Sequence, residues 1–174
     1  MEHAKEMSAV ALFFLIKRNG VIETLLGLGK PDKKVGANQW NAPGGRVNPG
    51  ESIRDACIRE IREEIAVSIS ADSIDLGSYL ACTVVGKENL THLYIAIVRD
   101  WQDEPQINCD EFTELKWFPI NNLPFNEMIA GDRHWVERFL QGEYVRGRVC
   151  HGDKTCVTVH DIDIEFSKTP FDIE

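Results

Sequence analysis

The feature that most constrains the fold of this chain is a glycine-rich loop followed directly by an amphipathic helix. The stretch PGGRVNPGESIRDACIREIREEIAV covers residues 43–67. Pro49-Gly50 predicts a turn, and Ser52 with Asp55 forms a Ser-x-x-Asp capping box, which marks a helix start. At about 100° per residue, the apolar side chains fall on one arc that must be buried: Ile53, Cys57, Ile58, Ile61 and Ile65. We therefore predict a helix over residues 52–65 that packs one face against a core.

Three glutamates, Glu60, Glu63 and Glu64, occupy the arc beside this apolar face. Carboxylates three and four positions apart on a helix repel one another, so their grouping requires an explanation. One interpretation is a surface helix on which nearby arginines pair with the acids, and the other is a divalent cation among them. Ala56 falls in the same arc, and its small side chain is expected to leave space above the acids.

The spacing of this stretch resembles the Nudix box. Gly45 is followed after five residues by Glu51, after seven more by Arg59-Glu60-Ile61, and then, after single-residue gaps, by Glu63-Glu64 and Ala66-Val67. Every fixed position of the family pattern matches except the last glycine, which alanine replaces. Because a glycine past a helix end commonly adopts a left-handed conformation, alanine there is expected to cost about 1 kcal/mol of local stability.

The resemblance implies both a fold and a chemistry. The implied fold is α/β (α+β), with a mixed β-sheet sandwiched between helices, the box as loop–helix–loop and a C-terminal β-hairpin extension. The implied chemistry is hydrolysis of a nucleoside diphosphate linked to another group, with Mg²⁺ or Mn²⁺ as cofactor. Such hard cations take oxygen ligands, retain several waters and are held by few carboxylates together with substrate phosphates.

Position by position, the resemblance assigns metal ligation within the box. Glu60 and Glu64 correspond to the principal metal ligands, and Glu63 to a further ligand or to the group that activates water. Gly44 is a candidate for the metal site through its backbone, because glycine lets the chain approach a ligand closely.

The remaining box residues and one outside acid have other implied roles. Glu51 lies near the metal or is tied to Arg59, and Arg59 is expected to be a structural clamp. Many family members also use a glutamate in a loop before a late strand, and here NCDEFTELKWF offers Asp110, Glu111 and Glu114. We rank Glu111 first, with an ordinary solvated acidic loop as the alternative. Glu63, Glu64 and Glu111 are thus the candidate catalytic residues.

A longer resemblance, over most of the chain, is to the MutT-like branch and to its oxidised-purine nucleoside triphosphatases. The segments LLGLGK, NQWNAPGGRVNPGE, WFPINNLPFNEM and GDRHWVERFL follow that branch in order. It implies substrate contacts at Asn41, Gly45, Asp132 and Lys30. The Asn41 amide carries both donor and acceptor and can therefore read a base edge, although a loop amide is the simpler alternative.

The base-recognition segment departs from that branch. Ile129 stands where the branch has a stacking tryptophan, and Gly131 stands where it has its first acid, so only Asp132 remains. Trp135 is expected to pack in the core. Base selectivity therefore stays open between an oxidised purine, an unmodified purine such as dGTP and a wider nucleotide range.

Hydrophobic patterns and turn residues predict the other elements. Strands are expected over residues 8–17, 21–28, 40–41, 79–86, 92–98 and 112–120. The first two should be joined by a hairpin turn at Asn19-Gly20. A second helix should run from about Arg133 to Leu140, and two last strands within residues 144–166 should turn at Gly152-Asp153. Because no repeat or linker interrupts the chain, we predict a single domain over residues 1–174.

Composition narrows the classes of partner. The formal net charge is -9, and no basic stripe is visible, so stable nucleic-acid binding is not expected. The apolar run over residues 9–16 is too short to span a bilayer and does not resemble a signal peptide. Five scattered cysteines favour a reduced, cytoplasmic protein. The expected partner is a small-molecule nucleotide, and the sequence does not indicate an oligomeric state.

Three hypotheses of function follow. The leading one is a Mg²⁺-dependent nucleoside triphosphate pyrophosphohydrolase that releases a nucleoside monophosphate and pyrophosphate. The second is hydrolysis of another Nudix substrate, such as a nucleotide sugar, a dinucleoside polyphosphate or an RNA 5′ end. The third, from another class, is a non-catalytic ligand-sensing domain, and the presence of all four box glutamates argues against it.

Overall fold

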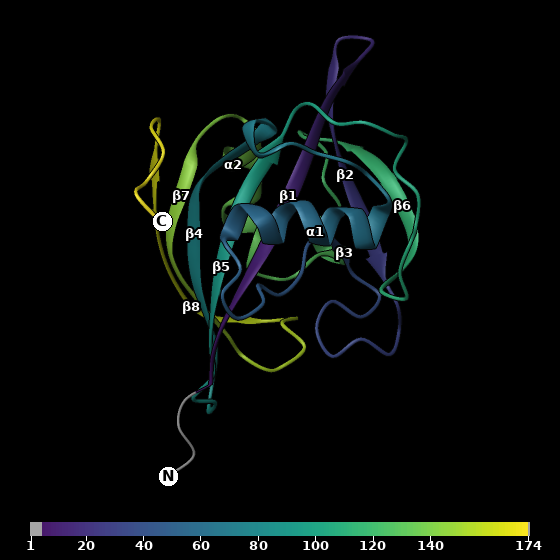
Figure 1. Cartoon of the computed structure of the whole chain (residues 1–174). Coiled ribbons are helices and arrows are strands. Elements are labelled where there is room, and N and C mark those ends of the chain that lie inside the picture. The colour runs from purple at the N-terminus through teal and green to yellow at the C-terminus, as the bar shows by residue number, and fades with distance from the viewer. Residues whose placement is uncertain (1–4, 174) are drawn as a thin grey trace.

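One mixed β-sheet dominates the computed structural model, which describes residues 5–173 (Figure 1). In this part of the chain eight strands follow the order β3-β2-β1-β5-β4-β7-β8, with β6 paired to β2. Their bounds are β1 Glu6–Arg18, β2 Val21–Gly29, β3 Trp40–Asn41, β4 Ile74–Val84, β5 Leu90–Val98, β6 Phe112–Pro119, β7 Tyr144–His151 and β8 Val159–Ser167. The pairs β1–β5 and β4–β7 are parallel and the others antiparallel, so the predicted mixed sheet is confirmed.

Two α-helices cover opposite faces of the sheet. The helix α1, Ile53–Ile65, lies in front of β1 and β5 in Figure 1, and α2, Val136–Leu140, lies behind them. Three short 3-10 helices complete the described elements: η1 Ala71–Ser73, η2 Phe125–Glu127 and η3 Asp132–His134. The predicted second helix is thus shorter than expected and is preceded by separate 3-10 turns.

The sheet is buried on both faces because side chains of a strand alternate in direction. Along β1, Leu12 and Phe14 belong to the core cluster under α1, whereas Phe13 belongs to the cluster under α2. Trp135 lies in the second cluster, with its ring centroid 5.8 Å from that of Phe13 in a T-shaped arrangement. The prediction that Trp135 packs in the core is therefore confirmed.

The two predicted hairpins are present, with one change. Asn19 and Gly20 both have positive φ, 49° and 82°, as a tight hairpin turn of the Asn-Gly kind requires. The C-terminal hairpin of β7 and β8 extends the sheet beyond β4. Its connection begins at Gly152 as predicted but continues to Thr158, so it is a loop and not a tight turn. Among the described residues, no helix is long and apolar enough to cross a membrane.

Candidate active site

The helix α1 begins and ends as its sequence predicts. The Ser52 side chain accepts a hydrogen bond from the Asp55 N–H at 3.1 Å, which caps the first turn. Ala66 follows the last turn with φ 57° and ψ 26°, in the left-handed region. This is the conformation that explains glycine in the family pattern, and alanine adopts it here at a cost.

The buried face of α1 differs in part from the predicted arc. Ala56 is fully buried, so the expectation that it leaves space above the acids is wrong. Ile53 and Ile58 are only partly buried at the margin of the same core cluster. The helix is therefore rotated so that Glu64, at 6% exposure, also faces inward.

Two adjacent glycines allow the loop to lie close against this inward face. Gly44 has φ 151°, and a Cβ there would lie 2.0 Å from the Val10 carbonyl oxygen of β1. A Cβ on Gly45 would lie 2.3 Å from Oε2 of Glu60. Only glycine fits at position 44, because a side chain there would meet the backbone of β1, whereas a side chain at position 45 would displace the Glu60 carboxylate. The Gly44 N–H donates to Oε2 of Glu64 at 2.8 Å, which fixes that carboxylate at the loop.

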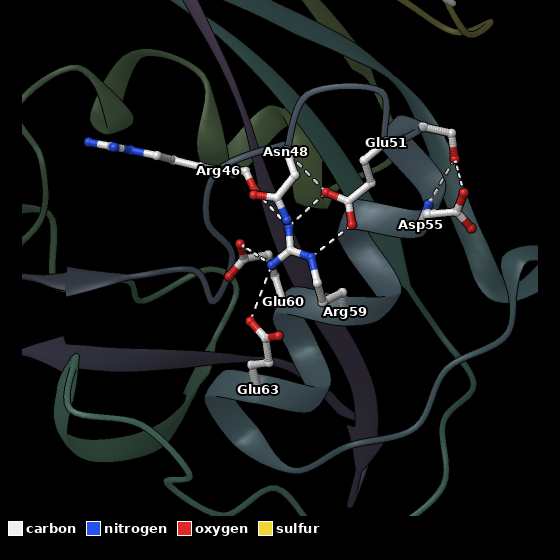
Figure 2. A network of polar contacts seen from close by, with 8 residues as sticks. Arg46, Asn48, Glu51, Asp55, Arg59, Glu60 and Glu63 are labelled. Carbon is white, nitrogen blue, oxygen red and sulfur yellow. Dashed lines mark hydrogen bonds and ion pairs between the residues drawn. The ribbon is translucent and has the colours of Figure 1, made fainter.

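Arg59 binds the other box acids in one network, shown in Figure 2. Its guanidinium donates to both carboxylate oxygens of Glu51 at 2.7 and 2.8 Å, and to Oε1 of Glu60 at 2.7 Å. It also reaches the Arg46 carbonyl at 2.8 Å and Oε2 of Glu63 at 3.2 Å. The hydrogen bond from Arg59, with one from the Asn48 N–H, lowers the pKa of Glu51 to about 2. Of the two positions expected for Glu51, the structure shows the one tied to Arg59.

The box acids differ sharply in environment. Glu63 is the most exposed, with 60% of its side chain accessible, whereas the Glu60 side chain is 13% exposed. Burial raises the pKa of Glu64 from 4.5 to about 7, and the negative charges of Glu60 and Glu111 act in the same direction. The Gly44 N–H and the positive charge of Lys33 partly oppose this shift. Glu64 is therefore a buried acid whose neighbours include two further acids and one lysine.

Two loops meet beside Glu64 and bring Glu111 to the box. The Lys30 N–H donates to the Glu111 carbonyl at 3.0 Å, and the Lys30 ammonium donates to Oδ1 of Asp110 at 3.0 Å. The Lys33 ammonium lies 2.6 Å from Oε2 of Glu111. Lys30 is thus paired with an exposed acid. Lys33 is the lysine whose charge lowers the pKa of Glu64, and the sequence did not single it out. Its only signal in the sequence was a position in the polar loop before the box.

Asn41 lies at the edge of the sheet, on β3. Its amide Nδ2 donates to the Gln39 carbonyl at 2.8 Å, while Oδ1 is buried and has no hydrogen-bond partner within residues 5–173. Gly36 approaches the same amide so closely that a Cβ there would lie 2.6 Å from Nδ2. A buried acceptor without a partner is costly, so Oδ1 is available for a ligand.

Asp132 lies in η3, and its segment runs beside that of Asn41. Trp40 forms a parallel bridge with Met128, and the Gln39 amide donates to the Met128 carbonyl at 3.0 Å. Burial raises the pKa of Asp132 to about 7, partly offset by a hydrogen bond from Trp135. Beside Gly131 the imidazole of His151 fills part of the space, since a Cβ on Gly131 would lie 3.4 Å from its Cε1.

The predicted site residues thus form two groups. The first contains Gly44, Gly45, Glu60, Glu64 and Glu111, joined by contacts or charge. The second contains Asn41 and Asp132, on neighbouring segments. Among residues 5–173, no three His, Cys, Asp or Glu side chains already lie together as a metal site. The acidic side chains nevertheless fit a hard cation, because all are carboxylates. A cation would offset the burial that chiefly raises the pKa of Glu64, and also the smaller repulsion by Glu60 and Glu111.

Comparison with known proteins shows the family of the chain. A family model described as NUDIX domain matches residues 6–139. The chain is 29% identical over 136 residues to an oxidized purine nucleoside triphosphate hydrolase of Danio rerio, which covers 78% of this chain and 85% of that protein. It is 26% identical over 156 residues to the protein of the same name in Mus musculus, covering 90% and 96%.

A solved structure confirms the fold. The MutT protein of Bacillus halodurans superposes with a TM-score of 0.71 over 94% of this chain and 99% of that one, at 16% identity. That identity supports the fold alone, whereas the domain match covers most of the sequence, including the whole box. The chain therefore belongs to the Nudix family and is a Nudix hydrolase.

Proposed function

We propose that this Nudix hydrolase is a Mg²⁺-dependent nucleoside triphosphate pyrophosphohydrolase. It converts a purine nucleoside triphosphate, such as dGTP or 8-oxo-dGTP, and water into a nucleoside monophosphate and pyrophosphate. The observation that carries the proposal is the buried carboxylate of Glu64, fixed at the glycine loop and surrounded by Glu60, Glu111 and Lys33. The relatives named oxidized purine nucleoside triphosphate hydrolases support the substrate class.

In this proposal Glu60 and Glu64 hold the cation, with Glu63 and the Gly44 backbone beside them. A bound Mg²⁺ supplies charge neutralisation of the phosphate chain and activation of water. Gly45 lets the phosphate chain approach the helix, because no side chain stands over the Glu60 carboxylate. The ion pair between Arg59 and Glu51 holds the loop against the helix.

Glu111 is the residue to which we assign proton acceptance. Its side chain is 53% exposed, so water and substrate can reach it, and its charge acts on Glu64. The water oxygen bonds to phosphorus, the proton passes to the Glu111 carboxylate, and the bond between the α- and β-phosphate groups breaks to release pyrophosphate. Proton transfer to a positioned carboxylate contributes on the order of 10²–10⁴-fold to such reactions.

Base recognition is assigned to Asn41 and Asp132. The free Oδ1 of Asn41 can accept a hydrogen bond from the base. Asp132, whose pKa burial raises to about 7, can present a protonated carboxyl as a donor near neutral pH. The departures at Ile129 and Gly131 remove a stacking ring and an acid, so we expect weak discrimination between dGTP and 8-oxo-dGTP.

A substrate panel tests the proposal. The purified protein is incubated with Mg²⁺ and dGTP, 8-oxo-dGTP, ATP, a nucleotide sugar or a dinucleoside polyphosphate, and products are separated by ion exchange. We expect a purine triphosphate to give equimolar monophosphate and pyrophosphate at the highest kcat/KM. Preferred cleavage of the nucleotide sugar or the dinucleoside polyphosphate would establish the alternative Nudix activity and reject the proposal.

A further inference from the structure

Lys33 is a cation placed within the acidic site. It lies in the loop that joins β2 to β3, and its ammonium is 2.6 Å from Oε2 of Glu111. Its positive charge also acts on the buried carboxylate of Glu64. The lysine therefore pairs with the acid assigned to proton acceptance, and its charge reaches the acid assigned to the cation.

The position of Lys33 is fixed by packing as well as by charge. A Cβ on Gly29 would lie 3.2 Å from Cδ of Lys33, so the side-chain stem runs against the end of β2. The ammonium lies 5.2 Å from the ring centroid of Phe112, and the side chain is only 23% exposed. A lysine held in this way loses little further freedom when it binds a ligand.

The neighbouring lysines are placed differently. The Lys30 ammonium is already paired with Asp110 on the outer side of the same loops. Lys34 is exposed, and within residues 5–173 it forms no ion pair. It carries the same charge as Lys33 one position away, and so provides a matched control.

We propose that Lys33 binds the phosphate chain of the triphosphate and that it exchanges its ion pair with Glu111 for this contact when the nucleotide enters. The inference rests on the proposed function and adds the residue that recognises the length of the phosphate chain. A half-exposed ion pair with one carboxylate is weak, whereas a triphosphate offers several charged oxygens, and lysine binds phosphate as a point charge. The exchange also frees Glu111 at the moment when its carboxylate is needed.

Binding measurements separate this role from a structural one. Isothermal titration with Mg²⁺ compares a dGTP analogue that has a methylene bridge between its α- and β-phosphorus atoms with dGMP. In Lys33→Met we expect the analogue to bind about tenfold more weakly, as for loss of one charged hydrogen bond, and dGMP to bind within about twofold of the wild type. Lys34→Met, with the same change in net charge, should bind both as the wild type does, and Lys33→Arg should recover most of the lost affinity.

Glu111 supplies the second half of the test. Glu111→Gln removes the carboxylate that competes with the phosphate chain for Lys33. The substitution should therefore tighten binding of the analogue when Lys33 is present and have no effect on it in Lys33→Met. Such a non-additive pair is the signature of coupled residues. Equal weakening of the analogue and dGMP in Lys33→Met, or the same loss in Lys34→Met, would overturn the inference.

The proposed function and this inference fail in different ways. If the wild-type protein cleaves a triphosphate in the substrate panel but Lys33→Met binds the analogue normally, only the role of Lys33 is wrong. If the wild-type protein binds the analogue no better than dGMP and releases no pyrophosphate, both are wrong.

Discussion

Glu64 is the residue that carries the proposed chemistry. Its carboxylate is buried, and the charges of Glu60 and Glu111 add to the effect of burial, so its ionised form is disfavoured without a cation although the Gly44 N–H and Lys33 partly offset this. Burial of an acid next to other acids does not stabilise a protein. The arrangement is therefore explained better by a bound ion than by folding.

The pH dependence of stability provides a test at Glu64. Burial raises the pKa of this acid from 4.5 to about 7 in the folded protein without metal. Between these values the unfolded chain loses the proton while the folded chain retains it, so the free energy of unfolding falls as pH rises, by up to about 3 kcal/mol. Urea denaturation in EDTA at several pH values should show a smaller fall in Glu64→Gln than in the wild type, because the buried Asp132 contributes its own fall to both proteins. A difference between the two proteins that stays constant from pH 4 to 8 would contradict the assignment.

Ala66 offers a second test at the residue scale. Because its φ is 57°, replacement by glycine relieves steric strain at the end of α1. We expect Ala66→Gly to raise the free energy of unfolding by about 1 kcal/mol, measured by urea denaturation, with turnover unchanged. Ala71→Gly, at a position without positive φ, is the control and should lower stability.

The element that organises the site is α1 together with its glycine loop. One face of the helix is held by the core, and the other is tied to the loop through Arg59, which contacts Glu51, Glu60 and the Arg46 carbonyl. The Glu60 charge still raises the pKa of Glu64, although Arg59 is paired with Glu60. The helix and the loop thus act as one rigid unit that presents the carboxylates.

Removal of the clamp should affect metal binding. Arg59→Ala frees Glu51 and Glu60, and we expect the affinity for Mg²⁺ to fall by about tenfold or more, as for other residues that orient metal ligands. The measurement is the Mg²⁺ concentration that gives half-maximal turnover. Arg62→Ala removes a charge from the exposed side of the same helix and should change that concentration by less than about twofold. Equal effects would show that Arg59 has no special role.

The sequence predicted the local features of the fold and of the box. The helix start at Ser52, the left-handed end at Ala66 and the hairpin turn at Asn19-Gly20 depend on neighbouring residues, so they were readable. The burial of Ala56 was not, because a helical wheel does not show how an element is rotated against its neighbours. The pairing of Lys33 with Glu111 was also missed, since it joins two loops far apart in sequence.

At the scale of the whole molecule, the sheet separates two tasks. The helix α1 and the loop before β6 carry the acids, and the edge at β3 with the segment before α2 carries Asn41 and Asp132. The resemblance predicted a mixed sheet between helices, and the fold comparison confirms that architecture.

The charge of the whole molecule leads to a prediction about nucleic acids. With a formal net charge of -9, the protein should repel a polyphosphate backbone. Fluorescence anisotropy with labelled single- and double-stranded RNA and DNA should show no binding tighter than about 100 μM at physiological salt. Salt-dependent binding in the micromolar range would favour an RNA 5′ end as substrate.

The most direct test of the central claim is pyrophosphate release from dGTP by the wild type and Glu64→Gln, each with Mg²⁺ and with EDTA. If the Glu60 and Glu64 carboxylates hold the cation that the reaction needs, the wild type releases pyrophosphate only with Mg²⁺. Glu64→Gln, which keeps shape and hydrogen-bonding capacity but loses the charge, should be at least about 100-fold slower. Turnover by Glu64→Gln at the wild-type rate, or by the wild type in EDTA, would contradict the account.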